Sequence, residues 1–139
     1  MDDIFVMTRV SASILSFYFD AKQQNISQDL MIKNINSALE KKHGKFDILH
    51  FDIEDGKFVS HKSFTINQIR KIICKKKKEV HLMVVNYKKY IKDYFLLADM
   101  FIVHNEVLSN DFDKTIDFLH KNKKFVGIAI KDRKSTRLN

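Results

Sequence analysis

The residues best suited to chemistry lie between Leu49 and Val59, in the stretch LHFDIEDGKFV. The run from Phe46 to Ile53 is rich in β-formers and is followed by the turn pair Asp55-Gly56, which together predict a strand that ends at a turn. Side chains alternate between the two faces of a strand, so His50 and Asp52 point the same way, about 6.5 Å apart along the backbone. An imidazole and a carboxylate at that spacing can bind one divalent cation.

A second stretch, EVHLMV from Glu79 to Val84, repeats the pattern, because His81 and Met83 share one face of a predicted strand. If the two strands are parallel neighbours, His81 lies beside His50 and Asp52 and supplies a third ligand. Such a set suits one divalent metal ion, Zn, Fe, Mn or Co. The alternative is that His81 is a hydrogen-bonded core residue, which is the commoner role for a single buried histidine.

The composition indicates one globular domain with a substantial core. The chain has 139 residues, of which 45% are hydrophobic and 12 are Phe. It has one cysteine, Cys74, so no intramolecular disulfide is possible and a reducing compartment, the cytoplasm, is expected. The first ten residues have no long apolar core, which argues against a secretory signal, and the most apolar window, Tyr94 to Val103, is too short to span a membrane.

The positive charge does not by itself indicate a nucleic-acid-binding protein. The formal net charge is +8, but the lysines are scattered, and the only block, Lys75 to Lys78, is expected in a solvated loop between a helix and a strand. No interleaving of aromatic and basic residues accompanies that block. We therefore expect neither nucleic acid nor a membrane as a partner, whereas a phosphorylated small substrate would benefit from the positive field.

Apolar and amphipathic stretches alternate along the whole chain, which predicts a parallel sheet with right-handed crossover helices. Ser27 and either Ser109 or Asn110 stand where helix N-caps are expected. The expected strands are 8–15, 46–53, 79–84, 99–104 and 124–130, and the expected helices are 28–42, 65–74, 87–97 and 111–122.

This order fits either an open doubly wound sheet or part of a (β/α)8 TIM barrel. The chain has three glycines and no glycine-rich phosphate loop after its first strand, which excludes a dinucleotide-binding fingerprint. Polar residues recur near the carboxyl ends of successive strands, where barrel enzymes place their sites: Ser13, His50, Asp52, His81 and His104. We therefore predict a partial TIM barrel, since a full barrel needs about 250 residues.

Three motifs in the same order resemble the ribulose-phosphate 3-epimerase family. They are the stretch SASILS from Ser11 to Ser16, the stretch HFDIEDGKFV from His50 to Val59, and the stretch VHLMV from Val80 to Val84 with Asn86 and Tyr90-Ile91 behind it. The resemblance extends to Lys131. It implies a metal-dependent isomerase of the pentose phosphate pathway that converts D-ribulose 5-phosphate to D-xylulose 5-phosphate by proton abstraction next to the carbonyl.

The resemblance also implies a role for each matching residue. His50, Asp52 and His81 would bind the metal, Asp52 would act as the catalytic base, and Ser13, His81 and Met83 would contact the substrate. On general grounds Ser13 could equally satisfy a backbone group and Met83 could simply pack in the core. His104 and Glu106 match a family His-x-Glu motif, to which we assign no direct catalytic role.

Several positions depart from the family pattern. Glu54 stands where the family usually has a methionine that lines the site, so a negative charge is added beside the metal. Lys57 replaces a common His, His61 a common Asn, Thr65 a Gly, and Tyr87 the Pro after Asn86. We expect His61, like His43 and His120, to be exposed. These departures keep open a second hypothesis, a non-catalytic homologue that serves as a binding or assembly partner.

The last eight residues, DRKSTRLN from Asp132 to Asn139, match the translation of a common sequencing-adapter sequence. We therefore expect residues 1–131 to be the amino-terminal part of one barrel domain and residues 132–139 to be a non-native tail. The second catalytic aspartate and the phosphate-binding loops of the family come from later strands, so this chain alone is expected to be inactive. The full-length protein is expected to be a homo-oligomer.

Overall fold

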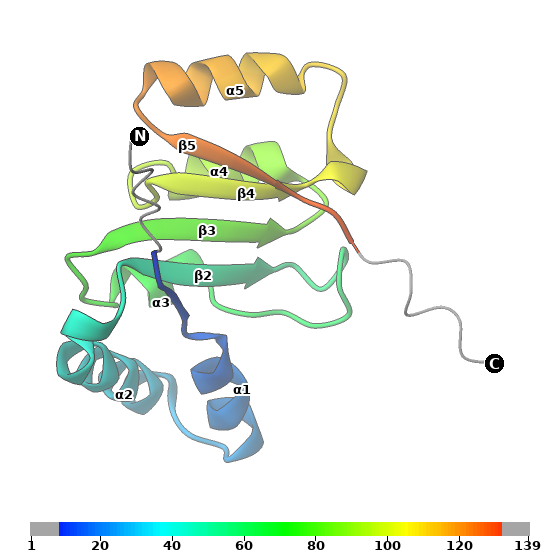
Figure 1. Ribbon diagram of the computed structural model, residues 1–139. Helices are drawn as coiled ribbons and strands as arrows, with labels where there is room; N and C mark the ends of the chain where they lie inside the picture. The colour runs from blue at the N-terminus through cyan, green and yellow to red at the C-terminus, as the bar shows by residue number, and fades with distance from the viewer. Residues whose placement is uncertain (1–8, 132–139) are drawn as a thin grey trace, which may run out of the picture.

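The computed structural model describes residues 9–131, which form one sheet of five parallel strands (Figure 1). The spatial order of the strands follows the chain, β1 to β5, without a reversal. A doubly wound sheet would reverse its strand order at a switch point, whereas consecutive order is that of a barrel wall. The predicted partial TIM barrel is thus confirmed. The strands are β1 (Ser11–Ser13), β2 (Ile48–Glu54), β3 (Lys77–Met83), β4 (Met100–His104) and β5 (Phe125–Ala129).

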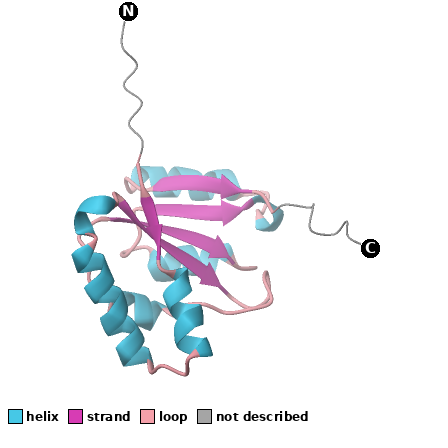
Figure 2. Cartoon of the chain, turned by 60° about the horizontal axis from the view of Figure 1, so that its bottom comes forward, coloured by secondary structure: helices cyan, strands magenta, loops and turns pink. Residues whose placement is uncertain are grey.

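Five α-helices connect these strands, together with two short 3-10 helices. Figure 1 shows α3 and α4 behind the sheet, and no helix of the described residues covers the face toward the viewer. Figure 2 shows the same arrangement from below, with the strands pointing one way. The helices are α1 (Leu15–Gln23), α2 (Gln28–Lys41), α3 (Ile66–Arg70), α4 (Tyr87–Tyr94) and α5 (Phe112–Lys121), with η1 at His43–Lys45 and η2 at Asn105–Val107.

The two faces of the sheet differ as strand alternation requires. One face is apolar, fully buried and covered by the helices; it includes Leu49, Phe51 and Ile53 of β2, as predicted, with Leu82 and Phe101 beside them. The side chains of His50, Asp52 and His81 project from the other face. Burial of the apolar face fixes the register, because a slip by one residue would exchange the two faces. The hydrophobic core therefore determines where the polar side chains point.

Helix α1 was not predicted, and the expected first strand 8–15 is wrong at its carboxyl end. The strand ends at Ser13, and Leu15 begins the helix. Phe17, Tyr18 and Phe19 favour strands by propensity, and the segment has no clear apolar stripe of helical period, so the sequence did not indicate a helix. Contacts override this preference, since Tyr18 packs edge-to-face on Phe64, with 5.2 Å between the ring centroids.

Other predicted boundaries moved by a few residues. Helix α3 is only five residues long and ends at Arg70, and the lysine block is not wholly a loop, because Lys77 and Lys78 begin β3. Ser27 caps α2 as predicted, accepting a hydrogen bond from the Leu30 N–H. The predicted cap of α5 is wrong, since Asp111 occupies that position without a side-chain cap. Residue 8 of the expected first strand and the tail 132–139 lie outside the described residues.

Across residues 9–131, none of the helices combines the length and the apolar character needed to cross a lipid bilayer.

Candidate metal centre

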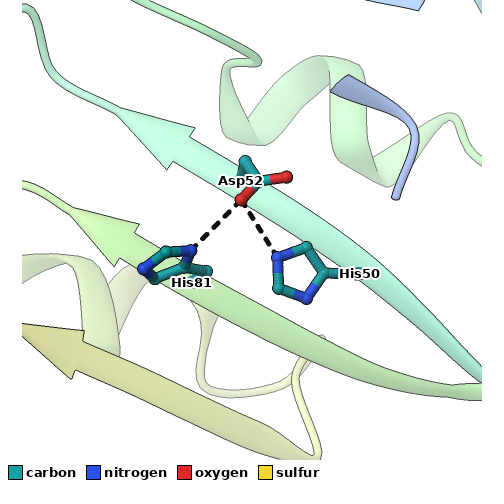
Figure 3. A group of neighbouring side chains, drawn as sticks. All are labelled: His50, Asp52 and His81. Carbon is teal, nitrogen blue, oxygen red and sulfur yellow. Dashed lines mark hydrogen bonds and ion pairs between the residues drawn. The ribbon is translucent and has the colours of Figure 1, made fainter. Parts of the chain in front are cut away.

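His50, Asp52 and His81 meet on the open face of the sheet, on two adjacent strands. Strands β2 and β3 pair in parallel with Asp52 opposite His81. The Oδ1 atom of Asp52 lies 3.0 Å from His50 Nε2 and 3.2 Å from His81 Nδ1 (Figure 3). One candidate ligand atom from each residue lies within 4.8 Å of the other two. The predicted convergence of these three side chains is therefore present.

These three groups are partly buried but reachable. Their side chains are 17%, 13% and 21% exposed for His50, Asp52 and His81, respectively. Two imidazoles and a carboxylate form a donor set that fits Zn, Fe, Mn or Co. Each residue points a nitrogen or oxygen at the same small space, so the cluster could hold one metal ion. Three protein ligands would leave at least one coordination position of that ion open to another ligand.

Glu79 joins this cluster from β3, and sequence reasoning missed it. Its Oε1 lies 2.7 Å from His50 Nδ1 and accepts a hydrogen bond of 2.5 Å from Ser11 Oγ. Glu79 precedes His81 by two residues in β3, so the two side chains lie on the same face of the strand. The signal that could have identified it was therefore the alternation that identified His81.

His104 of β4 extends the cluster on the other side. Its ring stacks on His81 with centroids 5.0 Å apart, and the Nε2 atoms of the two rings are 2.9 Å apart. The buried Nδ1 of His104 has no hydrogen bond but lies 3.5 Å from the Oε2 atom of Glu106. Since His104 contacts His81 and not Asp52, its position fits a supporting role for His81.

The two remaining predicted substrate contacts lie on the same side of the sheet. Ser13 donates a hydrogen bond of 2.8 Å to Asp52 Oδ2 and accepts one of 3.3 Å from the Leu15 N–H, so its hydroxyl both holds the carboxylate and satisfies a backbone group. Met83 is half-buried at the end of β3, in register with Glu54. Their contacts with a substrate stay predictions.

The charges of Asp52 and His50 stabilise each other. Burial alone would raise the pKa of Asp52, but hydrogen bonds from His50, His81 and Ser13 outweigh it and hold that pKa well below its usual range. The hydrogen bond to Asp52 raises the pKa of His50 despite the opposing effect of burial, and Glu79 adds to the rise. Both shifts favour the charged pair, and a cation that binds His50 Nε2 must compete with the proton on that nitrogen.

For Glu54 and His104 burial decides the direction of the pKa shift, and it disfavours the charged form of each side chain. Burial raises the pKa of Glu54, reinforced by the Asp52 charge, although His61 Nδ1 lies 3.0 Å from its Oε2. Burial and the neighbouring His81 lower the pKa of His104. His61 itself is exposed, as are His43 and His120, which confirms the expectation for all three. The charge that Glu54 adds is thus placed next to the candidate centre, as the sequence suggested.

The loop after β2 is pinned at the carboxyl end of the sheet by Asp55. Its carboxylate accepts hydrogen bonds of 2.8 Å from the backbone N–H groups of Lys57, Phe58 and Val85. The Phe58 ring then packs on His104, with 4.7 Å between the centroids. One side chain thus ties the loop to the end of β3 and places an aromatic wall beside the histidines.

Deprotonation of His50 should weaken the metal-free protein. Because its folded pKa is raised above the unfolded value of about 6.5, the stability it contributes is complete below that pH and is lost as the pH rises through the folded pKa. Denaturant unfolding in EDTA should therefore show the wild type losing stability relative to His50→Ala as the pH rises above about 6.5. The effect of His104 is common to both proteins. Parallel stability curves would contradict the prediction.

Comparison with known proteins bears on these residues directly. No curated protein matches the chain. The model of the ribulose-phosphate 3-epimerase family matches residues 9–138, which include every residue of the candidate centre and most of the tail 132–139. The origin of that tail stays a prediction. With almost the whole chain matched and its site residues in place, this protein belongs to the ribulose-phosphate 3-epimerase family.

Proposed function

We propose that this chain supplies one half of a metal-dependent active site that converts D-ribulose 5-phosphate to D-xylulose 5-phosphate. The observation that carries the proposal is the convergence of His50, Asp52 and His81 within 4.8 Å on adjacent strands. Family membership supports an epimerase-type reaction. The reaction, its metal dependence and a cytoplasmic location are parts of the proposal.

The chain's own residues divide the work as follows. His50 and His81 would hold the metal through Nε2 and Nδ1, the nitrogens that face Asp52. Asp52 turns Oδ1 toward the histidines and Oδ2 toward Ser13, so Oδ2 is the oxygen that accepts the proton from the carbon next to the carbonyl. The lowered pKa keeps Asp52 ionised at neutral pH, so the proton-accepting form is always present. A bound divalent ion would supply electrophilic stabilisation of the enediolate oxygens.

Ser13, His81 and Met83 would contact the substrate beside this base. Ser13 and His81 each hold a hydrogen bond to Asp52, so a sugar hydroxyl or carbonyl that reaches either one is placed against the catalytic carboxylate. Met83 offers an apolar surface at the end of β3 for the reacting carbons. The net charge of +8 would attract the phosphate group of such a substrate, as it would any anion.

Epimerisation also needs an acid on the opposite face of the substrate. We propose that residues 1–131 are the amino-terminal part of a longer barrel domain, whose later strands bring a second aspartate and the phosphate loops. The complete protein would then be a homo-oligomeric enzyme, and the 139-residue chain alone would give no turnover.

The test uses the protein encoded by the complete gene. In D2O it should convert D-ribulose 5-phosphate to D-xylulose 5-phosphate with deuterium incorporated at the carbon next to the carbonyl, as followed by NMR. Removal of metal with EDTA should abolish conversion, and a divalent ion should restore it. Full activity in the metal-free protein would refute the metal role. A metal-binding protein without conversion would instead support the non-catalytic homologue, to which the buried Glu54 beside Asp52 points.

A further inference from the structure

Glu79 is a buried carboxylate that the proposed reaction does not use. It is 9% exposed and lies opposite His50 in the β2–β3 register. An ionised carboxylate in such a place is costly unless it is hydrogen-bonded. Both of its observed partners, Ser11 and His50, reach the same oxygen, Oε1, from strands β1 and β2. The carboxylate is therefore held from two neighbouring strands and cannot swing away freely.

Both ring nitrogens of His50 face a carboxylate, since Nδ1 lies 2.7 Å from Glu79 Oε1 and Nε2 lies 3.0 Å from Asp52 Oδ1. A carboxylate only accepts hydrogen bonds, so the metal-free ring donates from both nitrogens. A cation bound beside Asp52 would take the place of the proton on Nε2, and the contact with Glu79 then keeps the other proton on Nδ1. A neutral imidazole has one N–H and one lone pair, and only the nitrogen with the lone pair can bind a cation. With the proton on Nδ1, the lone pair lies on Nε2. That atom is the one turned toward Asp52, 3.0 Å from Oδ1.

We propose that Glu79 is a positioning residue of the metal centre, which holds the proton on His50 Nδ1 and so presents His50 Nε2 to a divalent cation. The inference rests on the proposed metal-binding function. It adds a residue that touches neither the cation nor the substrate. Carboxylates that accept the second N–H of a ligand histidine orient the ring and increase its basicity.

No described group other than Glu79 can do this for His50. Asp52 contacts the opposite nitrogen and would be a ligand itself. Ser11 contacts Glu79 rather than the ring, so it acts on His50 only through the carboxylate. Removal of Glu79 should therefore release the ring, whereas removal of Ser11 should leave the His50 contact in place.

The experiment compares Co²⁺ binding by the 139-residue wild type, Glu79→Gln and Ser11→Ala. The glutamine keeps the shape, but its amide can donate as well as accept, so Nδ1 no longer has to carry the proton. We expect Glu79→Gln to weaken Co²⁺ binding by about 10- to 100-fold and to alter the visible absorption spectrum of the bound ion. Ser11→Ala should change both much less.

A second measurement does not depend on the variant folding. Long-range proton–nitrogen NMR of the metal-free wild type, recorded above the pH at which the His50 ring is seen to lose its second proton, should show His50 with its remaining proton on Nδ1. The Nε2–H form would overturn the inference, and so would unchanged Co²⁺ binding in Glu79→Gln or an equal loss in Ser11→Ala. Absence of Co²⁺ binding in the wild type would instead overturn the proposed metal function, and this inference with it.

Discussion

Asp52→Asn is expected to abolish stoichiometric binding of a divalent cation by the chain. The carboxylate accepts hydrogen bonds from His50, His81 and Ser13, so it is the centre of the cluster as well as its only charged ligand. Asparagine keeps the size but removes the negative charge that attracts the cation. Because loss of an outer partner alone costs about 10- to 100-fold in affinity, loss of this ligand should cost more than about 100-fold.

The measurement is isothermal titration with Zn²⁺ or Co²⁺, together with elemental analysis of the purified protein. Asp113→Asn is the matched control, because Asp113 is exposed in the first turn of α5 and lies outside the cluster. Circular dichroism should show that both variants keep the secondary structure of the wild type. Normal metal content in Asp52→Asn would remove the basis of the proposed reaction.

The 139-residue chain is expected to associate with itself through its sheet edges. In the described residues β1 and β5 each pair on one side only, so their outer N–H and C=O groups are open to another strand. Near β5 the apolar side chains of Ile128 and Ile130 are 55% and 78% exposed. Sedimentation or light scattering should therefore detect dimers or larger aggregates at micromolar concentration.

A charged edge should suppress this association. The double variant Ile128→Lys, Ile130→Lys places two positive charges on the strand edge, which proteins use to block strand addition. Leu96→Lys is the matched control, since Leu96 is 93% exposed but lies after α4, away from both edges. The control should associate as the wild type does. A wild-type chain that stays monomeric and unfolds cooperatively would be incompatible with this prediction.

The parallel sheet could be predicted from the sequence because its signals are local and repeated. In β2 the apolar residues Leu49, Phe51 and Ile53 alternate strictly with the polar residues His50 and Asp52. This period of two predicts both that the segment is a strand and which side chains share a face. Helix α1 could not be predicted in the same way. Its residues prefer strands, and the packing of Tyr18 on Phe64, far along the chain, decides the outcome.

The candidate centre was predictable to the extent that its residues share strand faces. Parallel neighbouring strands predicted that His81 would lie beside His50 and Asp52, and the structure adds the register that places His81 opposite Asp52. The contact of Glu79 with His50 could not be predicted in this way, because alternation places Glu79 on the same face as His81 but does not show which side chains it reaches. Only the pairing of β1 with β2 and of β2 with β3 shows that Ser11 and His50 converge on Glu79.

The pinned loop after β2 has a consequence for ligand capture. Asp55 restrains the backbone at Lys57, Phe58 and Val85 before any ligand arrives. Ordering of flexible segments opposes association, and a rim that is already fixed avoids that entropic penalty. A substrate of the proposed reaction should accordingly meet a preformed rim on this side, with arrival governed by diffusion rather than by loop closure.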